Sequence, residues 1–205
     1  MSVSPPPGPD HQRLNTLCEQ GARSAAEALA LFLGEPRPRV TLSGVESATY
    51  GALLTRLGGD DRVLSVGFGI AGAVSGVLAL LVEEGEAMAM LERLVPGVTQ
   101  RGFDERARGA FCEVGNILAS AFLNELASTL RTSCIPSVPS LIHDAADAAL
   151  RRAMELDTTR LGDDAERPGW LVTAELEREG TCVAVRLVIM PGDDSIERLI
   201  EADRR

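Results

Sequence analysis

The stretch FCEVGNILASAFLNELASTL, residues 111–130, decides the fold of the second half of the chain. Its apolar residues recur at helical spacing and predict one long helix with a buried face. That face consists of Phe111, Val114, Leu118, Phe122 and Leu126. Residues three apart share a face of a helix, so Glu113 and Asn116 project side by side. A polar stripe continues from them through Ser120 and Asn124, and this row of uncharged groups indicates a functional surface.

A proline completes a longer pattern. Twenty-two residues separate Asn116 from Pro139, which lies in the segment CIPSVPSLIHD. Glu, two residues, Asn and then Pro at this interval is the signature of the CheC-type chemotaxis phosphatases, including the CheC and CheX proteins. The surrounding CEVGNIL and PSVPSL also resemble that family. One position departs from it, because Gly109 stands where the family usually has Asp or Ser.

The resemblance implies a function and a partner. The family hydrolyses the aspartyl phosphate of a CheY-like response regulator in chemotaxis signalling. By resemblance, Asn116 orients the attacking water and Glu113 pairs with a lysine in the regulator's active site. A carboxamide suits this role because it both donates and accepts hydrogen bonds and has no proton to lose. The chain itself needs no cofactor, and magnesium is expected on the regulator. A CheD-like deamidase is a second partner that the resemblance allows.

A rival interpretation stays open. A Glu three residues before an Asn on a helix is common and is usually only solvated. The alternative is therefore a non-catalytic module of the same fold that docks on a response regulator, a CheD-like deamidase or a flagellar switch component. A small-molecule enzyme is disfavoured, because the sequence has no phosphate-binding glycine loop, catalytic triad or metal-ligand set.

Composition sets the class of protein. The 205 residues suffice for one domain with a sizeable core. We expect a flexible proline-rich lead over residues 1–10 and a single CheC-like domain over 11–205. The net charge is −10 and all 20 basic residues are arginine. An acidic chain without a basic run argues against binding of nucleic acid, which requires neutralised phosphates.

The cysteines and the N-terminal sequence favour a cytoplasmic protein. The four cysteines, Cys18, Cys112, Cys134 and Cys182, form no CxxC motif and have no histidine at ligand spacing. The opening MSVSPPPGPD has no apolar core of a secretion signal. Reduced thiols in the cytoplasm follow from both observations.

One uncharged run tests for a membrane span. Residues 63–82 are long enough to cross a bilayer. Glycines interrupt the run, however, and its flanks are acidic rather than arginine-rich. Two buried strands that turn near Ala71 and Gly72 fit this pattern better, so no membrane span is expected.

The chain also repeats itself. When residues 17–22 (LCEQGA) are placed over residues 111–116 (FCEVGN), the Cys, Glu and Gly coincide. Later in each half, an apolar run leads to a short helix carrying Glu-Arg-Leu. A duplicated unit is therefore predicted, with halves of about 11–100 and 101–205. The resemblance implies an α/β fold with pseudo-twofold symmetry, about six strands and two long exposed helices.

The two halves predict the same order of elements. The first should contain helix 11–33, strand 39–42, helix 46–57, two strands within 63–82 and helix 85–94. The second should contain helix 104–130, strand 134–142, helix 144–156, strands 170–178 and 181–190 and helix 194–202. The first half lacks a complete motif, since Ala22 aligns with Asn116 and Val45 takes the place of the proline. One complete site per chain is expected.

Overall fold

The computed structural model describes residues 9–34, 39–57, 61–72, 74–157, 165–178, 181–192 and 195. The predicted lead therefore lies outside the described residues except for Pro9 and Asp10, which open the first helix. The predicted terminal helix, residues 194–202, lies outside them as well, apart from Ser195.

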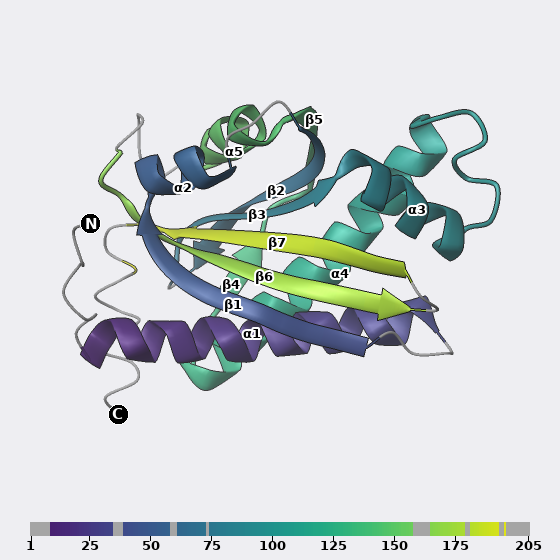
Figure 1. Ribbon diagram of the computed structural model, residues 1–205. Helices are drawn as coiled ribbons and strands as arrows, with labels where there is room; N and C mark the ends of the chain where they lie inside the picture. The colour runs from purple at the N-terminus through teal and green to yellow at the C-terminus, as the bar shows by residue number, and fades with distance from the viewer. Residues whose placement is uncertain are drawn as a thin grey trace.

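The described residues alternate helices with strands in two successive sets (Figure 1). The first set comprises α1 (Pro9–Leu33), β1 (Arg39–Thr49), α2 (Tyr50–Leu57), β2 (Arg62–Gly72), β3 (Gly76–Glu83) and α3 (Glu84–Leu94). The second comprises α4 (Glu105–Thr129), β4 (Cys134–Pro136), β5 (Ser140–Ala145), α5 (Ala146–Met154), β6 (Pro168–Arg178) and β7 (Thr181–Pro191).

All strands join one antiparallel sheet, and its order reveals the duplication. The order is β1-β6-β7-β3-β2, and both β4 and β5 pair with β2. Exchanging β1 with β4 and β5, β2 with β6, and β3 with β7 reproduces this order in reverse. A pseudo-twofold axis therefore passes between β3 and β7, as the predicted duplicated unit requires.

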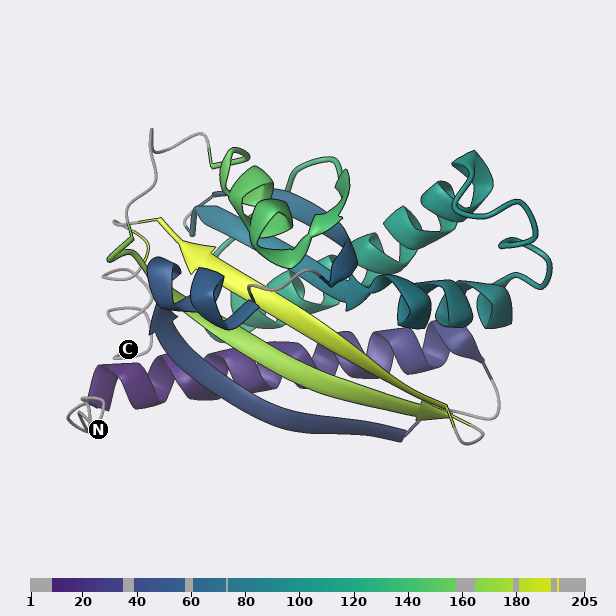
Figure 2. The same cartoon turned by 45° about the horizontal axis from the view of Figure 1, so that its top comes forward.

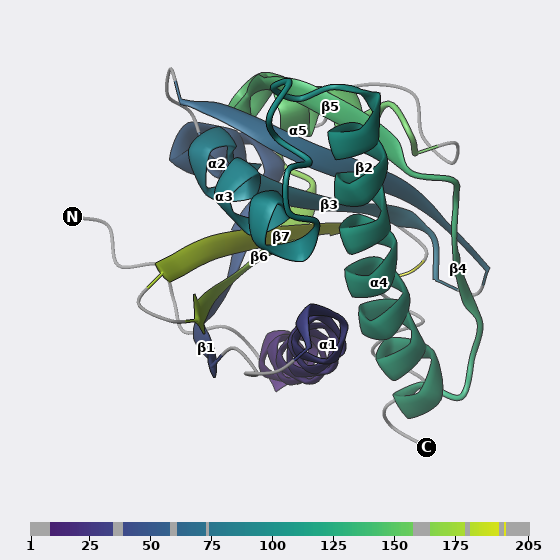
Figure 3. The same cartoon turned by 90° about the vertical axis from the view of Figure 1, so that its right-hand side faces the viewer.

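Helices cover both faces of the sheet. The long helices α1 and α4 pack against each other on one face, and Figure 3 shows α1 nearly end-on beside α4. The short helices α2 and α5 lie on the opposite face. Strand residues alternate between the faces. In β2, for example, Leu64, Val66 and Phe68 enter the core beneath α1 and α4, whereas Val63 enters the core beneath α2 and α5.

The uncharged run at residues 63–82 forms the predicted hairpin, because β2 and β3 pair along their length. Gly72 and Gly76 have φ angles of 121° and 139°, which residues other than glycine rarely adopt. The turn is held from outside, since the backbone N–H of Ser75 donates to Ser195 Oγ at 2.7 Å. None of the helices in the described part of the chain has the length and apolarity needed to cross a membrane.

Two strand predictions need correction. The first strand does not end at Leu42 but runs to Thr49, because a bulge between Leu42 and Gly44 lets β1 pair with β6 beyond the glycine. The single strand expected over 134–142 is two strands. Ser137 separates them by bonding back to β2, where its N–H donates to the Gly69 carbonyl at 2.8 Å.

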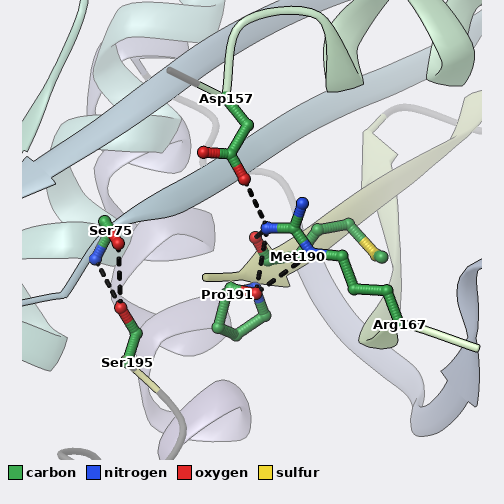
Figure 4. Close-up of polar contacts among 6 residues, drawn as sticks. All are labelled: Ser75, Asp157, Arg167, Met190, Pro191 and Ser195. Atoms are coloured by element: carbon green, nitrogen blue, oxygen red, sulfur yellow. Dashed lines mark hydrogen bonds and ion pairs between the residues drawn. The ribbon is translucent and has the colours of Figure 1, made fainter. Parts of the chain in front are cut away.

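A buried arginine joins the start of β6 to the end of β7 (Figure 4). Arg167 lies just before β6, and its guanidinium donates to the carbonyl oxygens of Met190 and Pro191 at the end of β7, both at 2.9 Å. It also pairs with the Asp157 carboxylate at 2.6 Å, and both charged side chains are 2% exposed. A buried charge needs such pairing, so these contacts hold Asp157, the start of β6 and the end of β7 together.

Candidate functional site

The helix α4 is well anchored at its start. The Asp104 carboxylate accepts hydrogen bonds from the N–H groups of Arg106 and Ala107 at 3.0 and 3.1 Å, which caps the helix. The predicted apolar face is confirmed, because all five of its residues are buried in the core. The side chains that point away from this core are therefore held on a fixed support.

The predicted polar stripe lies on the outer face of α4. Glu113, Ser120 and Asn124 are exposed, and Asn116 is half-buried. Glu113 has the only charge in this row of four, so its carboxylate is free to meet a cation while the amides and the hydroxyl offer neutral hydrogen-bonding groups. The structure thus brings Glu113 and Asn116 to one accessible surface.

Close packing places α4 over the strand next to the proline segment. A Cβ atom added to Gly115 would lie 2.9 Å from Val66 Cβ, so only glycine allows this approach of α4 to β2. Val66 pairs with Leu141 of β5, and Pro139 lies two residues before Leu141 in the connection from β4. Gly115 of α4 therefore packs on the strand that pairs with the segment following Pro139.

The alignment of the two long helices needs correction. Ala22, aligned with Asn116 by sequence, is 5% exposed and faces the interior. The exposed stripe of α1 instead consists of Thr16, Glu19, Arg23 and Glu27. Its spacing equals that of the stripe Glu113, Asn116, Ser120 and Asn124 on α4. Matching three identical letters had shifted the alignment by three residues, which rotates a helix by about 60° relative to its burial pattern.

The corrected alignment also leaves α1 without the motif. Thr16 takes the place of Glu113, and Glu19 takes the place of Asn116. The inner face of α1 is built from small residues, and a small apolar cavity lies between it and the sheet. The cavity is lined by Ala22, Ala25, Ala26, Leu29, Leu80, Leu118, Val172, Val185 and Leu187. On this evidence α1 serves packing, whereas α4 presents polar chemistry.

The three cysteines whose side chains are described offer no nucleophile. Cys18, Cys112 and Cys134 are free thiols, and the side chain of Cys182 lies outside the described ones. Burial raises the pKa of Cys18 to about 12, with a further contribution from the Glu19 charge. Burial also raises the pKa of Cys112, beside Glu113, although Arg108 opposes the shift. These thiols stay protonated and unreactive at neutral pH.

Two further residues lie near the site: Phe103, which the sequence did not single out, and His143, which by spacing alone has no partner ligands for a metal. Phe103 lies just before the N-cap of α4, and His143 lies on β5 four residues after Pro139. Their rings meet edge to face, with centroids 5.6 Å apart. The scarcity of aromatic residues was a usable signal, because with only five phenylalanines in the chain each one is a candidate for a specific packing contact. Within the described ranges, no group of three or more potential ligands could hold a metal ion.

Comparisons with known proteins identify the fold. No protein-family model matches the sequence, and no curated protein does. Thermotoga maritima FliY superposes with a TM-score of 0.72 at 17% identity, covering 100% of this chain and 98% of that one. The FliM middle domain from H. pylori gives 0.66 at 14%, covering 98% and 99%. CheX from Desulfovibrio desulfuricans gives 0.55 at 12%, covering 85% and 99%. The chain therefore has the CheC-like fold that these FliY, FliM and CheX structures share, as the resemblance in its sequence implied.

Proposed function

We propose that this protein is a phosphatase that hydrolyses the aspartyl phosphate of a CheY-like response regulator. One observation carries the proposal: Glu113 and Asn116 share the outer surface of a helix that packs through Gly115 on Val66, and Val66 pairs with the strand that follows Pro139. The fold is one that a chemotaxis protein, CheX, also has. We further propose that the protein acts in the cytoplasm, where such regulators work.

The proposed reaction requires little covalent chemistry from the phosphatase itself. An aspartyl phosphate is hydrolysed by in-line attack of water through a loose transition state, so positioning and charge stabilisation dominate catalysis. The Asn116 carboxamide holds the water with two hydrogen bonds: its oxygen accepts one from the water, and its N–H donates one to the water oxygen. Glu113 pairs with a lysine of the regulator and so fixes the approach. The regulator brings its own magnesium ion, which stabilises charge on the phosphate.

Holding both groups on one helix gives them a fixed separation. Gly115 lies between them and presses the helix against Val66, so the helix has little freedom to tilt. Preorganisation of this kind lowers the entropic cost of reaching the reactive geometry. On α1, Thr16 stands in place of Glu113 and Glu19 in place of Asn116. Because α1 therefore lacks both groups, we propose one productive regulator per chain.

A second function has support of its own. The TM-scores of the superpositions on FliY and FliM are higher than that on CheX. One of the FliM structures was determined in complex with FliG. A non-catalytic module that docks on a flagellar switch component, a regulator or a CheD-like deamidase would use the same exposed helices. Only the phosphatase, however, requires the side chains of both Glu113 and Asn116.

Phosphate release separates the two functions. A panel of CheY-like regulators is phosphorylated with a small phosphodonor, and loss of the aspartyl phosphate is followed with and without the protein. We expect faster loss with one regulator and no acceleration by Asn116→Ala. The result could instead be that the protein binds a regulator carrying a stable phosphate mimic but does not accelerate loss of phosphate from that regulator. Docking would then be the function. Glu19→Ala, at the corresponding place on the exposed stripe of α1, is the matched control.

A further inference from the structure

An imidazole joins three elements beside the candidate site. His143 on β5 places its Nε2 atom 3.0 Å from the Glu84 carboxylate at the start of α3. The same ring meets Phe103, which in turn lies edge to face with Phe111 of α4, at 6.4 Å between centroids. We call Glu84, Phe103, Phe111 and His143 the His143 cluster. Figure 2 shows α3, its loop and the start of α4 projecting together beyond the sheet.

The cluster connects the two parts of the motif. His143 follows Pro139 on the same segment, and Phe111 precedes Glu113 on α4 by less than one turn. Phe111 is fully buried, while the His143 side chain is 25% exposed. A displacement of β5 relative to α4 therefore has to move this ring out of its contacts. The cluster lies between the water-positioning helix and the strand that follows the proline.

The pseudo-symmetric place in the second half, where β6 begins and β7 ends, is held together without a histidine. There, Arg167 before β6 reaches the end of β7, as Arg62 at the start of β2 reaches Glu84 after β3 at 3.4 Å. The second half completes its corner with backbone carbonyls and the buried Asp157 (Figure 4). Only the corner next to α4 brings in an aromatic imidazole and a phenylalanine.

We propose that His143 is a positioning residue for the phosphatase reaction: it holds the Pro139 segment against α4 through Phe103 and Glu84 and so sets where Asn116 places the water. This inference rests on the proposed function. It does not require His143 to touch the regulator or the phosphate. Displacing a reacting group by about 1 Å can cost a hundredfold in rate, so a ring at this junction controls kcat from outside the reacting atoms.

Charged groups surround the ring, and the carboxylate of Glu84 is the one whose pKa the contact shifts. Glu84 and Arg62 face it from α3 and β2, and Arg108 of α4 lies over the Phe103 ring at 5.9 Å. The hydrogen bond with His143 is the main reason why the pKa of Glu84 lies below its ordinary value. Stability from this carboxylate is therefore present above the ordinary pKa of a glutamate and is lost as the pH falls through the lowered value.

Two substitutions divide the ring contact with Phe103 from the contact with Glu84. His143→Phe keeps an aromatic ring on Phe103 but loses the Glu84 partner, and His143→Gln keeps a polar group but loses the ring. We expect kcat for phosphate release to fall about tenfold or more in His143→Gln, with KM for the regulator changed less than about twofold, and to recover partly in His143→Phe. His11→Gln, the same change at the other histidine, is the matched control.

Amide hydrogen exchange supplies a readout that does not depend on activity. In His143→Gln, the amides of residues 103–116 should exchange about tenfold faster than in the wild type, while those of α5 stay unchanged. A folded variant with unchanged kcat and unchanged exchange overturns the proposal, and so does a loss of binding without a loss of kcat. If the wild type accelerates no regulator, the proposed function is wrong, and the exchange rates still decide whether His143 holds α4.

Discussion

The helices α1 and α4 have the same length, 25 residues, and related places in a duplicated sheet, yet they present different surfaces. The stripe of α4 is neutral after Glu113, whereas the stripe of α1 carries Glu19, Arg23 and Glu27. Duplication provides two equivalent surfaces, and under the proposed function only one of them must keep the reactive groups. The other helix is then free to change as long as it still covers the sheet.

Their glycines show the same division of labour. A Cβ atom on Gly21 of α1 would lie 2.7–2.9 Å from side-chain atoms of Phe122 and Leu126, so this glycine serves the contact between the two helices. The glycine of α4, Gly115, meets Val66 of the sheet instead. Gly21 allows the close contact between the two helices, and Gly115 allows the close contact of α4 with the strands.

The largest expected effect comes from removing the polar groups of α4. Changing Glu113 and Asn116 together to Ala should reduce accelerated phosphate release by at least about a hundredfold, because one positioned hydrogen-bonding group alone can be worth that much. Changing Thr16 and Glu19 together to Ala, at the corresponding places on α1, should leave the rate within about twofold. Equal losses from the two double variants would contradict the one-site assignment.

The glycines provide a second test, with equal stability effects and unequal functional ones. Gly115→Ala and Gly21→Ala should each lower the free energy of unfolding by about 1–3 kcal/mol through overpacking, offset by up to about 1 kcal/mol from better helix propensity. Only Gly115→Ala should also slow phosphate release, since it lifts α4 from Val66. Urea unfolding and the phosphatase assay, run on both variants, check this difference.

A smaller change is expected when only the charge of α4 is removed. Glu113→Gln should raise KM for the phosphorylated regulator a few-fold and leave the free energy of unfolding nearly unchanged, because the side chain is exposed. The wild-type KM should rise with salt, and that of the variant should respond less, since salt screens exposed charge pairs. Glu27→Gln on α1 is the control. A KM for Glu113→Gln equal to the wild-type value at low salt would rule out the lysine contact.

The smallest effect concerns the loop that leads into α4. The Glu92 carboxylate accepts hydrogen bonds from the Thr99 hydroxyl and from the N–H groups of Thr99 and Gly97, and these lower its pKa. The loop contacts should therefore persist above the ordinary pKa of a glutamate and weaken as the pH falls through the lowered one. Exchange of the Gly97 and Thr99 amides should speed up in acid, relative to amides of α1, and Glu92→Gln should remove this extra pH dependence.

The sequence predicted those features whose signal is local and periodic. The apolar period of residues 111–130 gave the buried face of α4, and the uncharged run at 63–82 gave the central hairpin. The bulge near Gly44 and the break at Ser137 depend on pairing with strands far away, so a glycine or proline read by itself misplaces the strand ends. The alignment of α1 failed for a related reason, because Cys18 and Glu19 match by letter while burial decides which side of a helix faces outward.

The candidate site divides in the same way. Glu113 and Asn116 follow from spacing along one helix. The contact of Phe103 with His143 cannot be predicted from spacing, because it forms only when the sheet brings β5 beside the start of α4. Side chains that act directly leave a motif in the sequence, whereas those that hold them in place are found by packing.

The pairing of β1 with β6 and of β5 with β2 means that each half lends its outer strand to the hairpin of the other. A single ancestral unit could complete this sheet only by exchanging strands with a second copy, which makes a symmetric dimer the natural forerunner of the present chain. Fusion of such a dimer would turn an association that depends on concentration into one within a single molecule. It would also allow the two copies to diverge, since a homodimer carries every substitution twice.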